Sequence, residues 1–332
     1  MNTTQATSSE NHIKTRFLIV SDTHGEEFGP EVNSLEADVA IHCGDLTEES
    51  KVEEYQTSMR LLKNLNARLK LVIAGNHDFT MDTPVFKKKV AEATPALDPV
   101  LVKREYGDFE EMKQFFNEAE AAGIHFLGEG TCKFELENGA SLTVYASPYT
   151  MSLGGDWGFQ YHPDQGHEFC IEKGVDVVIT HGPPNGIMDY TDSRKRAGCP
   201  HLFGAIARAR PRLHCFGHIH EGWGAKLVTW RGQPSEIPSH FTDIDNSKSV
   251  VIDSLANLKA SRFDTPETIA EKSKRRDSLH REGCRSTSHC TGDAEPLKYG
   301  EQTIFVNASI EGTEDYQMHA PWLIDLELPR AR

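Results

Sequence analysis

The sequence predicts a layered α/β fold, and two observations carry this prediction. Five short apolar runs, mostly aliphatic or β-branched, each stop at a glycine or a polar residue; they cover residues 17–20, 38–41, 71–74, 177–179 and 213–216. Continuous apolar runs of this kind are typical of strands that are buried on both faces. Helix-like stretches lie between some of the runs, and alternation of strand and helix favours an α/β arrangement. Taken alone, this pattern favours three layers.

The helices and one hairpin follow from local patterns. Residues 48–65 and 109–121 place apolar side chains at helical spacing, so each stretch is predicted to form a helix with one buried face. Residues 131–136 and 141–146 flank a turn that contains Asn138-Gly139. Because Asn-Gly is a strong turn signal, these two segments are predicted to pair as a hairpin.

Each of the five apolar runs is followed by a segment that contains metal-ligand residues. In chain order these segments are Ser21-Asp22-Thr23-His24, Gly44-Asp45, Gly75-Asn76-His77-Asp78, Thr180-His181-Gly182 and Gly217-His218-Ile219-His220. Asp, His and Asn are ligands that Mn²⁺, Fe²⁺ and Zn²⁺ accept. Ligands of open α/β sheets bind outside the carboxyl ends of the strands, so the five segments are expected to converge on one site. By contrast, His42 and His214 lie inside or beside apolar runs and are expected to be structural.

The residue types suit a hydrolytic centre with two metal ions. Asp22 and His24 can grip one cation from two directions, and Asp45 has two carboxylate oxygens with which it can bridge two cations. Asn76 adds a neutral amide oxygen. Two cations about 3.5–4 Å apart acidify a bridging water and clamp phosphate oxygens. His77 lies beside these ligands and can donate a proton to a leaving-group oxygen.

The order D-x-H, G-D, G-N-H-[E/D], H and G-H-x-H resembles the calcineurin-like metallophosphoesterase superfamily, and every element of that pattern is present between Asp22 and His220. The resemblance implies one metal ion held by Asp22, His24, Asp45 and His220, and a second held by Asp45, Asn76, His181 and His218. It also implies His77 as the catalytic histidine. The fold that it implies is a four-layer α/β/β/α sandwich with two mixed sheets.

A closer resemblance is to the small metallophosphoesterase-domain proteins. It is carried by residues 179–184 (Ile-Thr-His-Gly-Pro-Pro), 213–221, 303–309 and 320–326. Members of this group are generally phosphodiesterases that act on cyclic nucleotides and aryl phosphodiesters. The resemblance therefore implies hydrolysis of a small phosphodiester by attack of a metal-bridging hydroxide. It also implies strands at residues 227–230 and 303–308.

The five segments must meet, so one metallophosphoesterase domain is expected over residues 16–328. Residues 1–15 lack an apolar core and are expected to form a disordered leader rather than a signal peptide. Residues 231–300 are mostly polar and are interpreted as an insertion. They are either a disordered surface segment or a lid or docking element for a protein partner. Residues 87–107 are a second expansion that can form part of the pocket rim.

The net charge of −15, from 50 acidic and 35 basic residues, disfavours binding to long nucleic acids. It does not exclude a nucleotide substrate, because bound cations supply local positive charge. No apolar run approaches the roughly 20 residues of a membrane span, so no membrane partner is expected. The seven cysteines show no zinc-finger spacing, which favours reduced thiols and a cytoplasmic location.

Several functions remain open on the same metal centre. Besides a phosphodiesterase, the ligands suit a phosphomonoesterase or protein phosphatase, and the fold suits a non-catalytic scaffold; the complete ligand set argues against the scaffold. Substrate choice is expected to depend on the rim, where Asp189 and Tyr190 join Asn76 and His77 as candidate substrate-binding residues. Further rim candidates are Asn185, Met188, Trp157 and Phe159. The ligands admit Mn, Fe or Zn as the two divalent ions.

Overall fold

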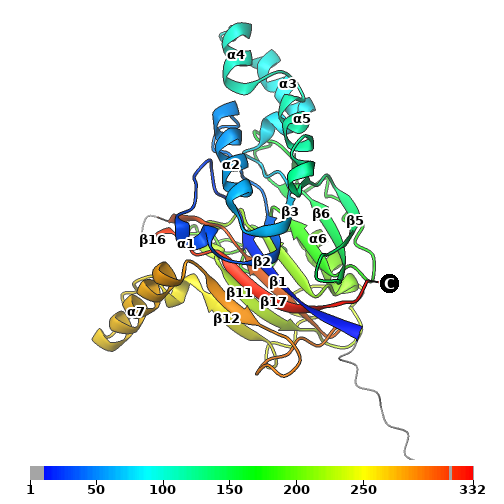
Figure 1. Cartoon of the computed structure of the whole chain (residues 1–332), viewed down its shortest axis with the longest axis vertical. Helices are drawn as coiled ribbons and strands as arrows, with labels where there is room; N and C mark the ends of the chain where they lie inside the picture. The colour runs from blue at the N-terminus through cyan, green and yellow to red at the C-terminus, as the bar shows by residue number, and fades with distance from the viewer. Residues whose placement is uncertain (1–10, 314–315, 332) are drawn as a thin grey trace, which may run out of the picture.

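The structure, a computed structural model, describes residues 11–313 and 316–331. Two large mixed sheets dominate it (Figure 1). The strands of the first sheet, in order across it, are β13 (Arg285–Ser288), β17 (Trp322–Pro329), β1 (His12–Val20), β2 (Ala37–His42), β3 (Ala67–Val72) and β4 (Ile124–Phe126). Strands β1 to β4 are parallel, and β17 pairs with β1 in the antiparallel direction.

The second sheet has a parallel centre and antiparallel strand pairs at both edges. Its strands, in order, are β12 (Val250–Ser254), β11 (Gly224–Thr229), β14 (Gln302–Asn307), β10 (Leu213–Phe216), β9 (Val177–Thr180), β6 (Ser141–Ser147) and β5 (Gly130–Glu135). The predicted hairpin is confirmed as β5 and β6, which pair around the Asn138-Gly139 turn. Two small sheets pair β7 (Thr150–Met151) with β8 (Gln160–Tyr161), and β15 (Glu311–Thr313) with β16 (Tyr316–Met318).

The two large sheets pack face to face through the apolar inner faces of their strands, and the outer faces of the strands are apolar as well. In β1, Phe17 and Ile19 belong to the core between the sheets, together with Val177 and Leu213 of the second sheet. Leu18, between Phe17 and Ile19, belongs to a separate core on the outer face. This alternation is the period-2 geometry of a strand. It explains why the apolar runs are continuous.

Helices cover both outer faces and complete four layers. The helices are α1 (Pro30–Asn33), α2 (Val52–Asn64), α3 (Thr83–Glu92), α4 (Pro99–Tyr106), α5 (Glu111–Asn117), α6 (Pro200–Ala209) and α7 (Pro266–Glu282). Short 3-10 turns are η2 (Phe79–Met81), η3 (Glu120–Ala122), η4 (His220–Gly222) and η5 (Leu255–Asn257). Helices α2 and α5 pack on the outer face of the first sheet, and α6 packs on that of the second. The four-layer sandwich is confirmed, and the three-layer arrangement is wrong.

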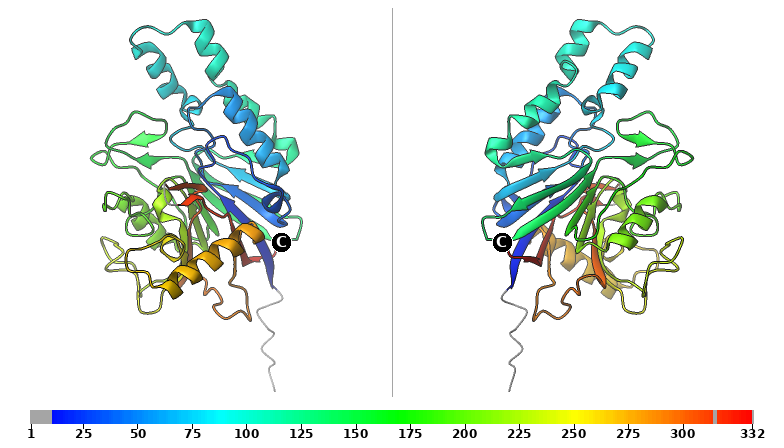
Figure 2. Two further views of the ribbon diagram at one scale, coloured as in Figure 1. Left: turned by 90° about the vertical axis from the view of Figure 1, so that its left-hand side faces the viewer. Right: turned by 90° about the vertical axis from the view of Figure 1, so that its right-hand side faces the viewer.

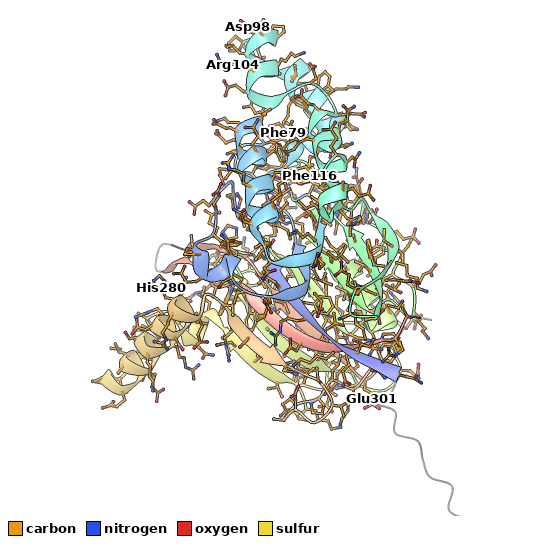
Figure 3. All side chains as sticks on the ribbon, viewed as in Figure 1. Phe79, Asp98, Arg104, Phe116, His280 and Glu301 are labelled. Carbon is orange, nitrogen blue, oxygen red and sulfur yellow. The ribbon has the colours of Figure 1, made fainter. Side chains whose placement is uncertain are left out.

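Helices α3 and α4 project from the body as an arm (residues 83–106), which Figure 2 shows from two sides. Phe79 lies near the base of the arm, and Asp98 and Arg104 lie toward its far end (Figure 3). No side chain of α4 is fully buried. The arm contains most of the predicted expansion at residues 87–107.

The polar segment at residues 231–300 contributes a strand to each sheet. Strand β12 pairs with β11 at the edge of the second sheet, and β13 pairs with β17 at the edge of the first. Helix α7 lies between β12 and β13 in the chain and projects from the body (Figure 1). It is exposed along most of its length. Docking of a protein partner by this segment stays a prediction.

The start of the chain differs from the predicted leader. Strand β1 begins at His12, which pairs with Pro329 of β17, so residues 12–15 belong to the first sheet. Residues 1–10 lie outside the described residues. Within the described part of the chain, every helix is too short or too polar to cross a membrane.

Candidate metal centre

The five predicted segments meet at the carboxyl ends of β1, β2, β3, β9 and β10. The backbone N–H of Asp22 donates to Gly44 O (2.9 Å), which joins the loops after β1 and β2. The backbone N–H of His218 donates to both carboxylate oxygens of Asp22 (3.0 Å each), which joins the two sheets. The convergence expected from the strand pattern is therefore present.

One group of predicted ligands consists of Asp22, His24 and His220. Their ligand atoms all lie within 4.8 Å of one another. Asp22 is fully buried, and its Oδ1 lies 3.5 Å from His220 Nε2. Asp22 and His24 follow a strand of the first sheet, and they thus lie beside His220, which follows a strand of the second.

A second group consists of Asp45, His181 and His218, again within 4.8 Å of one another. Asp45 Oδ2 lies 3.1 Å from His181 Nε2, and Asn76 Oδ1 lies 3.0 Å from the same nitrogen. Asn76 therefore joins this group, as its position in the sequence predicts. That Asp45 bridges to the first group stays a prediction.

The carboxylates and the histidines in the two groups stabilise each other's charged forms. Burial opposes the ionised form of Asp22, but the neighbouring histidines, His220 first, hold its pKa well below the usual range. Burial also lowers the pKa of His24, but nearby carboxylates, Glu311 first, outweigh it and raise that pKa to about 10. His181 behaves likewise: burial is outweighed by Asp45, and its pKa rises to about 9.

This charge pattern fits divalent cations. Ionised carboxylates surround histidines that hold protons only because of those carboxylates, and a metal ion displaces such protons when it binds. His218 already favours the neutral form that a metal needs, because burial lowers its pKa to about 4. A mixed set of imidazole, carboxylate and amide donors suits Mn, Fe or Zn.

His77 lies at the edge of the two groups. Its Nδ1 is 2.6 Å from Glu48 O, and because a carbonyl only accepts, Nδ1 carries the hydrogen. Its backbone N–H donates to Asp45 Oδ1 (2.8 Å). The ring contacts His24 edge-on (4.9 Å between centroids) and stacks on Trp157 (4.3 Å). His77 thus keeps Nε2 available for proton transfer, as its predicted role requires.

Asp78 holds the loops of this site together, a role that the sequence pattern did not assign. It is fully buried and accepts hydrogen bonds from the backbone N–H groups of Gly75, Leu46 and Thr47. These bonds join the loop after β2 to the loop after β3. Asp78 therefore positions Asp45 and Asn76.

Sequence reasoning also missed two acidic residues beside His24. Glu48 Oε2 lies 2.8 Å from His24 Nδ1, and Glu311 Oε2 lies 2.9 Å from His24 Nε2. Ser309 Oγ donates to Asp22 Oδ2 (2.9 Å). Ser309 and Glu311 follow β14, another parallel strand that ends at the site, so the rule used for the five segments pointed to them as well.

The two histidines expected to be structural support the ligand loops from within the sheets. Both are buried, and burial lowers the pKa of each to about 3. His42 Nε2 is 2.9 Å from Thr23 Oγ1, and His214 Nε2 is 2.9 Å from Thr180 Oγ1. Each threonine is adjacent to a predicted ligand, so a hydrogen bond between a threonine and a histidine supports one ligand loop in each sheet.

The rim candidates differ in their surroundings. Asp189 is fully buried and accepts hydrogen bonds from Gly186 N–H (2.8 Å) and the Arg196 guanidinium (2.6 Å), so it braces its own loop. Tyr190 is half exposed and lies beside Arg196. Contact of either residue with substrate stays a prediction. Trp157, in contrast, stacks directly on His77.

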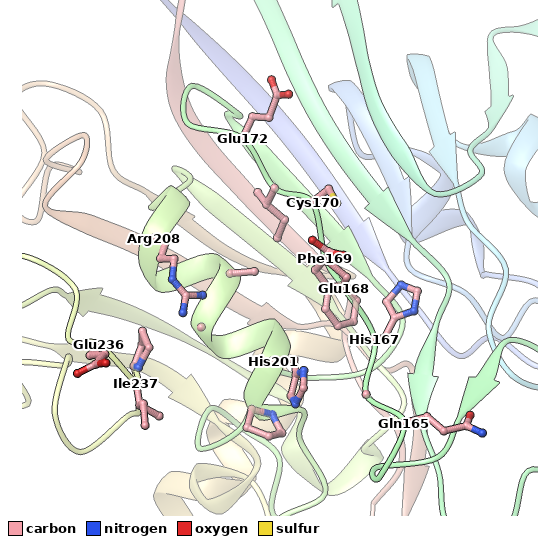
Figure 4. Close-up of a pocket in the computed structure, with 16 residues that line it drawn as sticks. Gln165, His167, Glu168, Phe169, Cys170, Glu172, His201, Arg208, Glu236 and Ile237 are labelled. Carbon is pink, nitrogen blue, oxygen red and sulfur yellow. The ribbon is translucent and has the colours of Figure 1, made fainter.

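A cavity of about 390 Å³ opens at the first group of ligands. Besides Asp22 and His24, its lining includes Glu26, Glu27, Glu48 and Glu311. A larger cavity of about 820 Å³ lies elsewhere, between residues 165–172, α6 and residues 236–238 (Figure 4). No predicted metal ligand lines that larger cavity.

Comparison with known proteins agrees with the fold and the ligand pattern. Residues 15–222 match the model of the family described as calcineurin-like phosphoesterase. This range contains every predicted ligand and spans more than half of the chain. The protein belongs to the calcineurin-like phosphoesterase family.

The chain matches less than two thirds of the length of each of these curated relatives. Human metallophosphoesterase domain-containing protein 1 is 33% identical over 215 residues, which are 63% of this chain and 62% of the relative. The UPF0046 protein T07D4.2 of Caenorhabditis elegans is 32% identical over 223 residues, 63% of this chain and 52% of the relative. Among solved structures, TT1561 of Thermus thermophilus aligns with a TM-score of 0.40 at 12% identity, over 78% of this chain and 97% of that one.

Proposed function

We propose that this protein is a metal-dependent phosphodiesterase that hydrolyses small phosphodiesters, including cyclic nucleotides, with two divalent ions of Mn, Fe or Zn. The observation that carries the proposal is the pair of ligand groups at the carboxyl edge of the two sheets. A non-catalytic scaffold has no need for buried carboxylates and histidines held so close together. Each group supplies both carboxylate and imidazole, as a hydrolytic centre requires.

The chain's own residues divide the work of the reaction. Asp22, His24 and His220 would hold one cation, and Asn76, His181 and His218 would hold the other, with Asp45 shared between them. When bound, the cations would offset the negative charge of the phosphate and lower the pKa of a water nucleophile. His77, fixed through Nδ1 to Glu48 O, would hold a proton at Nε2 and give it to the leaving-group oxygen.

The acidic cavity favours a diester over a monoester. Glu26, Glu27, Glu48 and Glu311 line the opening beside the first ligand group. A phosphodiester carries one negative charge, whereas a phosphomonoester carries close to two at neutral pH. Because carboxylates repel each additional charge, the monoester meets the larger electrostatic penalty. A phosphomonoesterase or protein phosphatase on the same centre is the alternative.

The test compares two chromogenic substrates. Metal-stripped protein is assayed with bis-p-nitrophenyl phosphate and with p-nitrophenyl phosphate, before and after addition of Mn²⁺. Cleavage that depends on added metal and favours the diester is expected. Preference for the monoester would establish the alternative. Absence of cleavage despite bound metal would overturn both and favour the scaffold.

A further inference from the structure

A third cavity, of about 360 Å³, lies between the arm and the body. Its lining comes from η2, α3, α4 and three loops: Glu49, Phe79, Phe86, Lys89, Val90, Leu97, Val102, Tyr106 and Trp157. Most of these side chains are aromatic or aliphatic, and we call the cavity the aromatic pocket. Its volume lies within the range of about 300–1,000 Å³ that is usual for small-molecule sites.

Trp157 connects the aromatic pocket to the candidate catalytic histidine. Its indole stacks on His77, with 4.3 Å between centroids and 23° between planes, and the same side chain lines the pocket. Glu49 lines the pocket as well and follows Glu48, whose carbonyl binds His77 Nδ1. The pocket therefore lies beside His77, with Trp157 stacked between the pocket and the face of the imidazole ring.

The loop that carries Trp157 is fixed in place. Gly158 N–H donates to Asn76 O (3.0 Å), and Phe159 N–H donates to Asp82 Oδ2 (2.8 Å). A Cβ at Gly158 would lie 2.7 Å from Phe79 Cα, so only glycine permits this close approach. The position of Trp157 between His77 and the pocket is thus specified by the sequence.

The pocket chemistry suits a planar aromatic group. The rings of Phe79, Phe86 and Tyr106 lie 5.9–6.2 Å apart, within the range for aromatic pairs. Lys89 Nζ lies 4.9 Å from the centroid of Phe79 and 5.2 Å from that of Trp157. Rings offer stacking, while Lys89 and Glu49 offer a donor and an acceptor to polar ring edges. An alkyl chain would use neither.

We infer that the aromatic pocket binds the planar aromatic part of the leaving alcohol, a phenol or a nucleobase-bearing ribose, of the phosphodiester substrate. This inference rests on the proposed function, because it places the phosphate at the metal centre. Val90, Val102 and Tyr106 are then specificity-determining residues. They lie on the arm, outside the ligand groups.

Competitive inhibitors test the inference without the influence of leaving-group acidity. Mn²⁺-loaded protein hydrolyses methyl p-nitrophenyl phosphate while phenylphosphonate, methylphosphonate or octylphosphonate is added. Phenylphosphonate is expected to bind roughly five- to tenfold more tightly than methylphosphonate, the effect of a stacked aromatic pair. Val102→Trp would fill the pocket and bring this ratio close to one. Val100→Trp places the same side chain on an exposed position of α4 and is expected to keep the ratio.

Two results would overturn the aromatic pocket as a leaving-group site. One is a ratio in Val102→Trp equal to that of the unmodified protein, with both proteins folded by circular dichroism. The other is octylphosphonate binding more tightly than phenylphosphonate, which would indicate a lipid-like substrate instead.

A binding measurement separates failure of the pocket from failure of the proposed function. Metal-free protein is titrated with p-nitrophenol, whose nitro group quenches tryptophan fluorescence. Trp157 is partly exposed, whereas Trp223, Trp230 and Trp322 are buried. Saturable quenching that Trp157→Phe and Val102→Phe both abolish supports the pocket even if no diester is hydrolysed, and Val102→Phe narrows the pocket without adding a tryptophan. Quenching that survives both substitutions contradicts it.

Discussion

Four of the seven predicted ligand residues have a left-handed backbone conformation. The φ angles are 54° at Asp22, 47° at His24, 52° at Asp45 and 68° at His218. This region disfavours residues other than glycine and costs roughly 1–3 kcal/mol each when the surroundings impose it. Four of the ten non-glycine residues with positive φ in the described part of the chain carry ligand atoms, which indicates that side-chain direction at this site is selected over local stability.

At the scale of single residues, Asp45→Asn is expected to weaken binding of both metal ions. The substitution keeps the shape of the side chain but replaces the ionised carboxylate beside His181 with a neutral amide. Metal content after dialysis, measured by inductively coupled plasma mass spectrometry, should fall well below that of the unmodified protein. Hydrolysis should fall by a hundredfold or more, on the order of the largest effects of altered metal surroundings. Near-normal metal content and turnover would exclude Asp45 as a shared ligand.

His77→Ala is expected to keep the metals and to slow substrates with poor leaving groups most. A positioned proton donor typically contributes about 10²–10⁴-fold, and the contribution grows as the leaving group becomes more basic. The measurement is kcat for a series of aryl methyl phosphates of increasing phenol pKa, together with metal content. Equal slowing across the series would mean that His77 transfers no proton.

At the scale of elements, strand positions were predictable because each central strand is apolar on both faces. Strands β1, β2, β9 and β10 contain four of the five predicted runs, and the run at residues 71–74 begins in β3 and continues two residues beyond it. The helices at residues 48–65 and 109–121 correspond to α2 and α5. Within the segment at residues 231–300, the largely apolar stretches at residues 249–252 and 255–258 indicated some order, and β12 and η5 lie there; the second strand of the segment was not predictable. Strand β13 reads Arg-Ser-Thr-Ser and has no apolar pattern, so its pairing with β17 depends on tertiary contact.

The loop that carries Trp157 shows the same limit for the site. Sequence spacing located the ligands, since they follow strands. It could not place Trp157 against His77, because that contact joins residues 80 positions apart through backbone bonds of Gly158 and Phe159. Glu311, by contrast, follows the expected strand at residues 303–308, so the rule used for the five segments could have found it.

Gly158→Ala is expected to disturb this loop more than its small volume suggests. The added Cβ would meet Phe79 Cα at 2.7 Å, so the loop must shift and draw Trp157 away from His77. We expect a loss of roughly 1–3 kcal/mol in stability, as for other forced contacts, and a weaker preference for phenylphosphonate. Thermal unfolding and the inhibitor ratio measure the two effects. Gly154→Ala is the matched control, because its Cβ would meet only side-chain atoms, the flexible carboxylate of Asp156 at 3.3 Å and Ser152 Oγ at 3.9 Å; an equal effect of both substitutions would reject the steric argument.

At the scale of the whole molecule, the metal centre is a joint product of the two sheets. The first sheet supplies Asp22, His24, Asp45 and Asn76, and the second supplies His181, His218 and His220. The partly buried hydrogen bond from His218 N–H to Asp22 crosses the boundary between them. Metal binding is therefore expected to stabilise the packing of one sheet on the other, because each group takes ligands from a distant part of the chain.

The buried histidine His214 makes the stability of the whole molecule depend on pH. Burial lowers its pKa to about 3 in the folded chain, against 6.5 for an ordinary histidine. The unfolded chain binds the proton first as the pH falls, so the stabilisation is complete above pH 6.5 and is lost progressively down to about pH 3. The loss approaches about 1.4 kcal/mol per pH unit in that window.

His214→Phe removes this titration while it keeps an aromatic ring against Phe216 and Phe305. At pH 7 the variant should be less stable by about 1 kcal/mol, because Thr180 Oγ1 loses its contact with His214 Nε2. Between pH 6.5 and 5 its stability should fall less steeply than that of the unmodified protein. Urea unfolding of metal-free protein at both pH values measures the difference, and His280→Phe on exposed α7 controls for loss of a histidine. Parallel pH dependences of the two proteins would show that His214 is not held neutral by the fold.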